Sequence, residues 1–192
     1  MDLDDYLTRI LPHRLNALSI AVLLLKFRLQ WEEPRPMQIM VDGKLQFEGT
    51  TTMFTNPATE VGVLHGRALL EFIGLKANAG KLVQLQVSSR QRDDAAIERF
   101  SANDNPLPLV TPQQAADSHP TDPTTAKRVL AELIVAAHKG VAHSSATYFE
   151  NPMAAEDMVL ALELTQRLIE RHVYEPLGKQ RPPIPVEARA RE

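Results

Sequence analysis

The sequence Val63-Leu64-His65-Gly66-Arg67-Ala68-Leu69-Leu70-Glu71-Phe72 places three ionisable side chains inside a segment that otherwise has the pattern of a buried helix. Apolar residues recur at helical spacing and form one stripe, which consists of Val61, Leu64, Ala68, Leu69 and Phe72. Ionisable groups are rarely buried without partners. The segment therefore predicts a helix that holds His65, Arg67 and Glu71 in specific contacts.

Three further segments have helical spacing, and the four together predict a mainly α fold with a four-helix core. The helices are expected over residues 3–30, from Asn56-Pro57 to near Gly74, from Asp122-Pro123 to about Phe149, and from Asn151-Pro152 to before Pro176. The last three begin with a capping residue followed by proline, a pair that suits a helix start. Pro12 is expected to end or kink the first pattern near Leu11.

A small β appendage is predicted beside these helices. Residues 37–48 surround Asp42-Gly43, which is typical of a hairpin turn. We favour a three-residue loop over residues 42–44, because it pairs Val41 with Leu45 and Ile39 with Phe47 and so gives one apolar face. Residues 82–87 alternate apolar and polar side chains, so they could add a third strand.

The 192 residues suffice for one domain with a substantial core, which we expect over residues 1–180. Five prolines make residues 101–123 a long loop. The proline-rich tail, residues 181–192, is expected to be extended and disordered.

Composition excludes several classes of function. Cysteine is absent, which excludes disulfides, thiolate metal sites and a cysteine nucleophile, and the formal net charge of −3 argues against a protein that coats nucleic acid. No metal-binding or nucleotide-loop motif occurs, so neither metal nor cofactor is expected. The N-terminus is acidic, and the longest apolar run, residues 17–25, has about half the length of a membrane span. These features predict a cytoplasmic protein without a membrane partner.

The first candidate site is a polar cluster of His65, Arg67 and Glu71 with His143 from the third helix. Arg67 and Glu71 are four residues apart and can form an ion pair, whereas His65 and Arg67 lie about 200° apart around the helix axis. The cluster could bind an anion or transfer a proton. It could equally be a structural network that joins two helices, which is the interpretation we favour because such networks also bury arginine and histidine.

The order of these residues resembles that of small bacterial helical proteins of the HEPN-like type, whose roles are uncharacterised. The resemblance covers about residues 56–149 and rests on the segment 65–72, on Asp93-Asp94 and on Val141-Ala142-His143. This chain has Gly66 and Ala68 where that group typically has alanine and asparagine. The resemblance implies a helical bundle that acts as a homodimer, with RNA or a nucleotide as the expected ligand.

A second candidate site follows from the same resemblance. Arg167 and His172 fit the spacing of arginine and histidine in HEPN ribonucleases. There, histidine would act as acid or base on a ribose hydroxyl while arginine stabilises the phosphate. We therefore expect a HEPN-like binding or regulatory domain. The alternatives are a metal-independent endoribonuclease that uses Arg167 and His172, or a structural subunit whose hairpin and proline-rich loop bind a partner protein.

Overall fold

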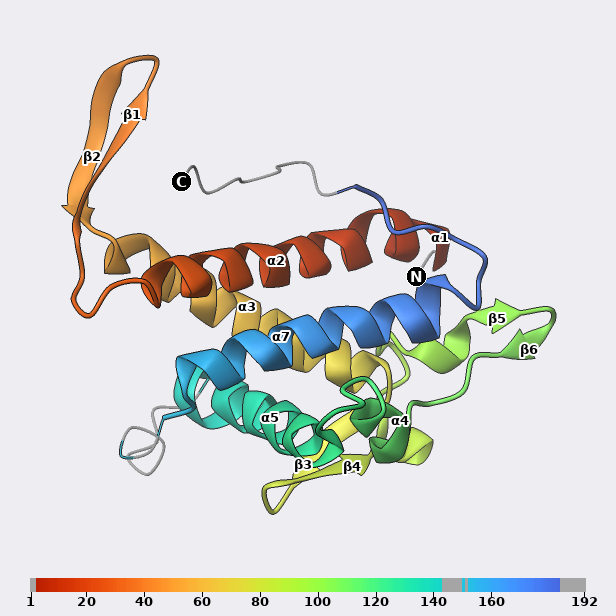
Figure 1. The fold of residues 1–192 in the computed structure, drawn as a ribbon. Helices are drawn as coiled ribbons and strands as arrows, with labels where there is room; N and C mark the ends of the chain where they lie inside the picture. The colour runs from red at the N-terminus through yellow and green to blue at the C-terminus, as the bar shows by residue number, and fades with distance from the viewer. Residues whose placement is uncertain (1–2, 143–149, 151, 184–192) are drawn as a thin grey trace.

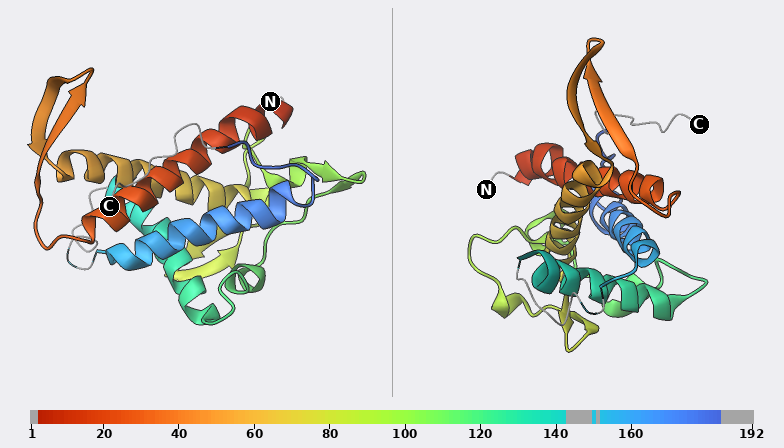
Figure 2. Two further views of the ribbon diagram at one scale, coloured as in Figure 1. Left: turned by 45° about the horizontal axis from the view of Figure 1, so that its top comes forward. Right: turned by 90° about the vertical axis from the view of Figure 1, so that its left-hand side faces the viewer.

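The computed structural model describes residues 3–142, 150 and 152–183, and it confirms the prediction of a mainly α protein (Figure 1). The long helices are α2 (Leu11–Arg28), α3 (Thr52–Phe72), α5 (Pro123–Val135) and α7 (Ala155–Ile169). Both α3 and α7 pack against α2 on one side and against α5 on the other (Figures 1 and 2). Each of these helices contributes fully buried leucines to the hydrophobic core, to which the shorter elements also contribute side chains.

The first helical segment continues through Pro12. The short α1 (Leu3–Asp5) leads into a π-helical turn, η1 (Tyr6–Ile10), and then into α2, with Pro12 in its first turn. Proline lacks the N–H that an α-helix would bond to the residue four positions earlier. The wider turn bridges the gap, since the Leu11 N–H bonds to the carbonyl of Tyr6 five residues before it.

The predicted start of the second helix, at Asn56-Pro57, is wrong. The helix α3 begins at Thr52 and contains Pro57 in its second turn. Pro57 is only the sixth residue of α3, so the one bond that it removes lies close to the helix start. The helix begins after Thr51, whose carbonyl accepts the Thr55 N–H at 3.0 Å. Thr51 is buried, and its Oγ1 accepts a bond from the Arg35 N–H at 3.2 Å, which joins the helix start to the segment before β1.

The start of the third helix is confirmed, since the Asp122 side chain accepts a bond from the Thr125 N–H at 2.9 Å. This helix, α5, continues as the π-helical segment η4 (Ala136–Ala142). The rest of its predicted length, to Phe149, lies outside the described residues. The predicted start of the fourth helix at Asn151-Pro152 is wrong, because residues 152–154 are not helical and α7 begins at Ala155 after an extended Ala154, while Asn151 itself lies outside the described residues. The last helix, α7, ends in a third π-helical turn, η5 (Glu170–Tyr174), so the predicted stop before Pro176 is confirmed.

The first hairpin consists of β1 (Pro36–Val41) and β2 (Lys44–Thr50), and its turn differs from the prediction. Asp42 and Gly43 both have positive φ, so they form a two-residue turn whose twist suits a hairpin. A bulge between Ile39 and Met40 then shifts the register by one residue. As a result, the predicted pairing of Ile39 with Phe47 is confirmed, whereas Val41 pairs with Lys44 and not with Leu45.

The predicted third strand does not join this hairpin. Instead, β4 (Lys81–Gln84) pairs with β3 (Leu75–Asn78), a strand that directly follows α3. A third small sheet joins β5 (Ser101–Ala102) to β6 (Asn105–Pro106), after the 3₁₀ turns η2 (Val87–Ser89) and η3 (Ile97–Arg99). The predicted loop 101–123 also contains α4 (Pro112–Ala116), which Thr111 and Gln114 cap reciprocally.

Close contacts hold α3 against its neighbours. A Cβ at Gly62 would collide with the Cβ of Ala21 on α2, so these two helices approach as closely as their backbones allow. One turn later, a Cβ at Gly66 would lie 3.0 Å from Leu133 on α5 and 3.2 Å from Leu162 on α7. The two glycines thus set the position of α3 and of the polar side chains between and after them.

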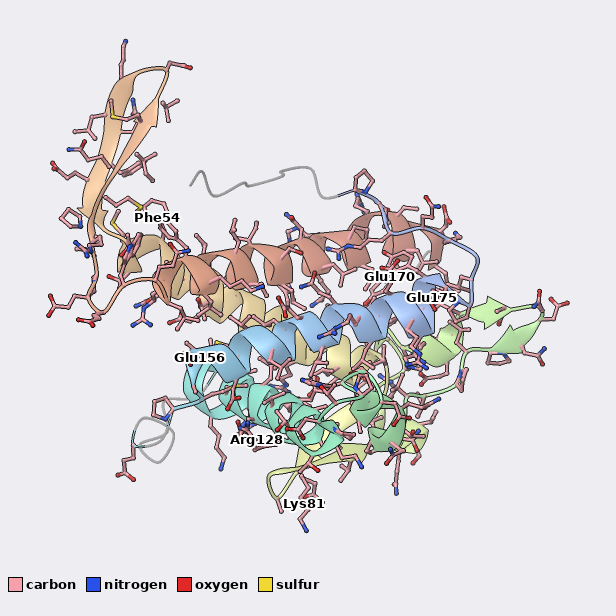
Figure 3. The ribbon with its side chains drawn as sticks, in the orientation of Figure 1. Phe54, Lys81, Arg128, Glu156, Glu170 and Glu175 are labelled. Carbon is pink, nitrogen blue, oxygen red and sulfur yellow. The ribbon has the colours of Figure 1, made fainter. Side chains whose placement is uncertain are left out.

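Polar contacts join α5 to α7 and join the ends of the described chain to the helical body. Arg128 on α5 forms a two-point ion pair with Asp157 on α7, with N–O distances of 2.7 and 3.0 Å (Figure 3). The Tyr174 hydroxyl donates to the Leu7 carbonyl. Arg181, at the start of the predicted tail, donates to Gln166 and Ser19 at 3.2 Å each, whereas residues 184–192 lie outside the described part.

One helical stretch among the described residues, Leu3–Arg28, is long and apolar enough to cross a membrane, and 33% of its most apolar window is buried. Core helices of soluble proteins pass the same test. In this structure the α2 portion packs against α3 and α7.

Candidate functional site

His65 contacts α2. Its Nδ1 accepts a hydrogen bond from Nη1 of Arg14 at 3.2 Å, and its ring stands edge-on to that of His13 with centroids 5.7 Å apart. Burial lowers the pKa of His65, and the charges of Arg14 and His13 lower it further. Because protonation of Nδ1 would break the bond from Arg14, the structure requires the neutral imidazole.

Arg67 and Glu71 form the predicted ion pair elsewhere on the helix, which confirms that pairing. Nε of Arg67 donates to Oε1 of Glu71 at 2.8 Å, and the two side chains are 31% and 36% exposed. A pair this accessible to water adds less than about 1 kcal/mol to stability. Only Nε of the guanidinium has a partner among the described residues, so Glu71 orients Arg67 and leaves its terminal nitrogens available.

Arg67 borders a pocket of about 380 Å³ that we call the basic pocket. Its polar residues come from three elements: Arg67 and Glu71 from α3, Lys76 from β3, and His138 and Lys139 from η4. The connection between α3 and β3 is only two residues long, and it returns Lys76 to the end of the helix. The wider π-helical turn of η4 carries His138 and Lys139, and such turns are frequent at functional sites.

The remaining walls of the basic pocket are apolar, with Ala77, Ile134 and Val135 among them. Glu71 is its one acidic residue and already neutralises Arg67. Lys76 and Lys139 therefore give the pocket a positive charge, although the whole chain carries a formal charge of −3. This arrangement can hold a ligand that has both an anionic group and an apolar part.

Glu71 also borders a second pocket, of about 230 Å³, in which charges balance. There Arg14 and Arg90 face Glu71 and Asp94. The Arg90 side chain is 8% exposed, its Nε lies 2.9 Å from Oε1 of Glu98, and its Nη2 donates to the carbonyl of Phe72 at the end of α3. Because Arg90 contacts the protein's own acceptors, we interpret this pocket as structural.

The structure does not join Arg167 and His172. Arg167 on α7 is exposed, and its guanidinium forms no hydrogen bond or ion pair with the other described residues. His172 on η5 is half-buried, and its Nε2 has no partner among the same residues. Burial lowers the pKa of His172, Arg171 lowers it further, and Glu175 opposes them. The other predicted histidine, His143, lies outside the described residues.

Of the two lysines of the basic pocket, the sequence alone did not reveal Lys76, because β3 has no alternating pattern long enough to predict a strand. Helical spacing places Lys139 on the same face of the third helix as His143, and the structure has the π-helical segment η4 at that position. Among the described residues, no group of three His, Asp or Glu side chains is placed so that it could hold a metal ion.

The chain has no match among models of known protein families, curated proteins or solved structures. The residues of the basic pocket are therefore the features that indicate a function.

Proposed function

We propose that the protein is a HEPN-like binding or regulatory domain whose basic pocket binds a phosphate-bearing ligand of mononucleotide size. The observation that supports this most is the convergence of Arg67, Lys76 and Lys139 on one pocket with apolar walls. Its volume, about 380 Å³, lies within the range of small-molecule sites.

Each part of the pocket suits one part of such a ligand. The ammonium groups of Lys76 and Lys139 would attract the phosphate, and the free terminal nitrogens of Arg67 would form paired hydrogen bonds with its oxygens. Glu71 holds the guanidinium in place beforehand, which lowers the entropic cost of binding. Ile134 and Val135 offer an apolar surface to the base.

We also propose a four-helix core and a homodimeric assembly for this protein. We infer that α2, α3, α5 and α7 correspond to the four-helix core implied by the HEPN-like resemblance. The resemblance supports a regulatory role and a homodimer, and it makes RNA or a nucleotide the expected source of the phosphate. Cleavage of RNA by Arg167 and His172 remains the alternative, in which the two side chains would act on the ribose hydroxyl and the phosphate.

A thermal-shift and calorimetric titration tests the proposal. Inorganic phosphate, a panel of mononucleotides and a short single-stranded RNA are each added to the wild type, to Lys76→Gln and to Lys81→Gln. Lys81 is the matched control, because it belongs to the same hairpin but is exposed and lies outside the pocket (Figure 3).

We expect a nucleotide to stabilise the wild type and Lys81→Gln equally, and to bind Lys76→Gln at least about tenfold more weakly, as the loss of one charged hydrogen bond implies. Equal binding to all three proteins, or no binding by any, would contradict the proposal. Cleavage of the RNA that is lost in His172→Ala would favour the endoribonuclease instead.

A further inference from the structure

The hairpin β1–β2 stands away from the helical body (Figures 1 and 2). Its contact with the rest of the molecule is concentrated where β2 meets the start of α3. Yet its strands expose large apolar side chains, namely Met40, Val41, Leu45 and Phe47, with Phe47 61% exposed. A lone two-stranded hairpin is only marginally stable in water. Its apolar surface therefore calls for a partner that covers it.

The body of the same chain carries a matching surface, which we call the α2–α3 groove. It is an open apolar pocket of about 530 Å³, lined among others by Ile20, Met53, Phe54, Pro57 and Val61. Ile20 and Val61 are 37% and 46% exposed, so these side chains too lack cover. Phe54 lies beside the base of the hairpin (Figure 3), but the exposed strands of the hairpin do not line the groove.

We propose that the hairpin of one protomer packs into the α2–α3 groove of a second copy of this chain, and that the exchange is reciprocal. A two-fold dimer buries both surfaces twice, because each protomer supplies one hairpin and one groove. Residues 36–50 and the ten residues that line the groove together fall in the range of about 20–30 residues a side that stable interfaces use.

The two surfaces can form ion pairs with each other. The hairpin carries the carboxylates of Asp42 and Glu48 as well as the ammonium group of Lys44. At one end of the groove lies neutral His65, whose Nδ1 accepts a hydrogen bond from the guanidinium of Arg14, and this guanidinium is a cation that the hairpin carboxylates can approach. Insertion into a lipid bilayer would bury Asp42, Lys44 and Glu48 without partners, at a cost of a few kcal/mol each. A second copy of the chain fits these charges, so we favour it over a membrane.

The test uses exposed positions, so that the variants fold. Phe47→Asp alters the hairpin, Val61→Asp alters the groove, and Val87→Asp is the matched control, since Val87 is an exposed apolar residue outside both surfaces. Circular dichroism checks folding. Sedimentation at about 10–100 µM protein, where micromolar complexes are populated, measures the mass of each protein.

We expect dimers for the wild type and Val87→Asp, and a dimer Kd raised at least about 30-fold for the other two, as for substitutions at interface hot spots. Mixing Phe47→Asp with Val61→Asp should restore a weaker heterodimer, because one hairpin and one groove remain intact in the mixture. The chain contains no cysteine, so the double variant Phe47→Cys, Val61→Cys should form disulfides between protomers, and Phe47→Cys alone should not.

A monomeric wild type would overturn the proposal. So would a dimer that both interface variants retain, or one that Phe47→Cys alone links, because these results would place the contact elsewhere or between two hairpins. A monomer that sediments with vesicles of phosphatidylcholine and phosphatidylglycerol would assign the apolar surface to a membrane.

Discussion

Gly62 and Ala21 show how much of this fold depends on single atoms. A Cβ at position 62 would overlap the Cβ of Ala21, so α2 and α3 cannot approach this closely with any larger side chain. The stripe of apolar residues in the sequence predicted a buried helix here. Which neighbour it packs against was not predictable, because that depends on the contact of two positions forty-one residues apart.

Gly62→Ala is therefore expected to destabilise the protein, despite the better helix propensity of alanine. Overpacking of this kind costs about 1–3 kcal/mol. Chemical denaturation measures the change, and Ala21→Gly combined with Gly62→Ala is the control. The double variant should be more stable than the sum of the single changes, since the clash is gone. Additive effects would show that the helices do not meet at this pair.

His65 gives the stability of the protein a dependence on pH. Its pKa in the folded state is lowered by burial and by Arg14 and His13, so the unfolded chain takes up a proton first as the pH falls. Stability should thus decrease as the pH falls through the ordinary histidine pKa, about 6.5, and level off below the folded value.

In His65→Gln this loss of stability between about pH 7 and pH 5 should be smaller than in the wild type. Urea denaturation at a series of pH values measures it. His119→Gln controls for the removal of a histidine as such. A pH profile in His65→Gln as steep as that of the wild type would mean that His65 is not held neutral by its neighbours.

At the scale of elements, the features that depend on neighbouring residues could be predicted from the sequence. Those that depend on contacts between distant residues could not. The Asp122 cap, the Arg67–Glu71 pair and the position of the first hairpin follow from residues within a few positions of one another, whereas the predicted helix starts at Asn56 and Asn151 were wrong. The strand β3 and the π-helical segment η4 do not, because each packs against a helix that is distant in the sequence, β3 against α5 and η4 against α3. The basic pocket lies among these elements, so Lys76 could not be placed beside Arg67 from the sequence.

A substitution at Thr51 tests what holds the start of α3 in place. Its buried hydroxyl accepts the Arg35 N–H, and its own N–H bonds to the Arg35 carbonyl, which ties the base of the hairpin to the helix start. Thr51→Ala should lower the free energy of unfolding by about 0.5–1.5 kcal/mol, because the part-buried hydrogen bond that its hydroxyl accepts from the Arg35 N–H is lost. Thr50→Ala, an exposed neighbour, should change it by less than about 0.5 kcal/mol. Similar losses of stability in both variants would mean that the contact between Thr51 and Arg35 does not hold the helix start in place.

At the scale of the whole molecule, a negatively charged chain gathers positive charge at one place. The basic pocket gathers Lys76 and Lys139 beside Arg67 in a chain whose formal charge is −3. The hairpin and most of the α2–α3 groove lie toward the other end of α3, so the proposed ligand site and the proposed dimer interface are separate surfaces. A variant such as Phe47→Asp should accordingly still bind the ligand.

The most direct test of the proposed function is to locate the ligand by amide chemical shifts during a titration with a mononucleotide. We predict shift changes that saturate and that concentrate at Ala77, Ala79, Gly80 and Val135, the backbone around the basic pocket. In Lys76→Gln these changes should require a higher ligand concentration, and in Lys81→Gln they should not. Changes centred on Arg167 and His172, or no saturating change at any amide, would contradict the account.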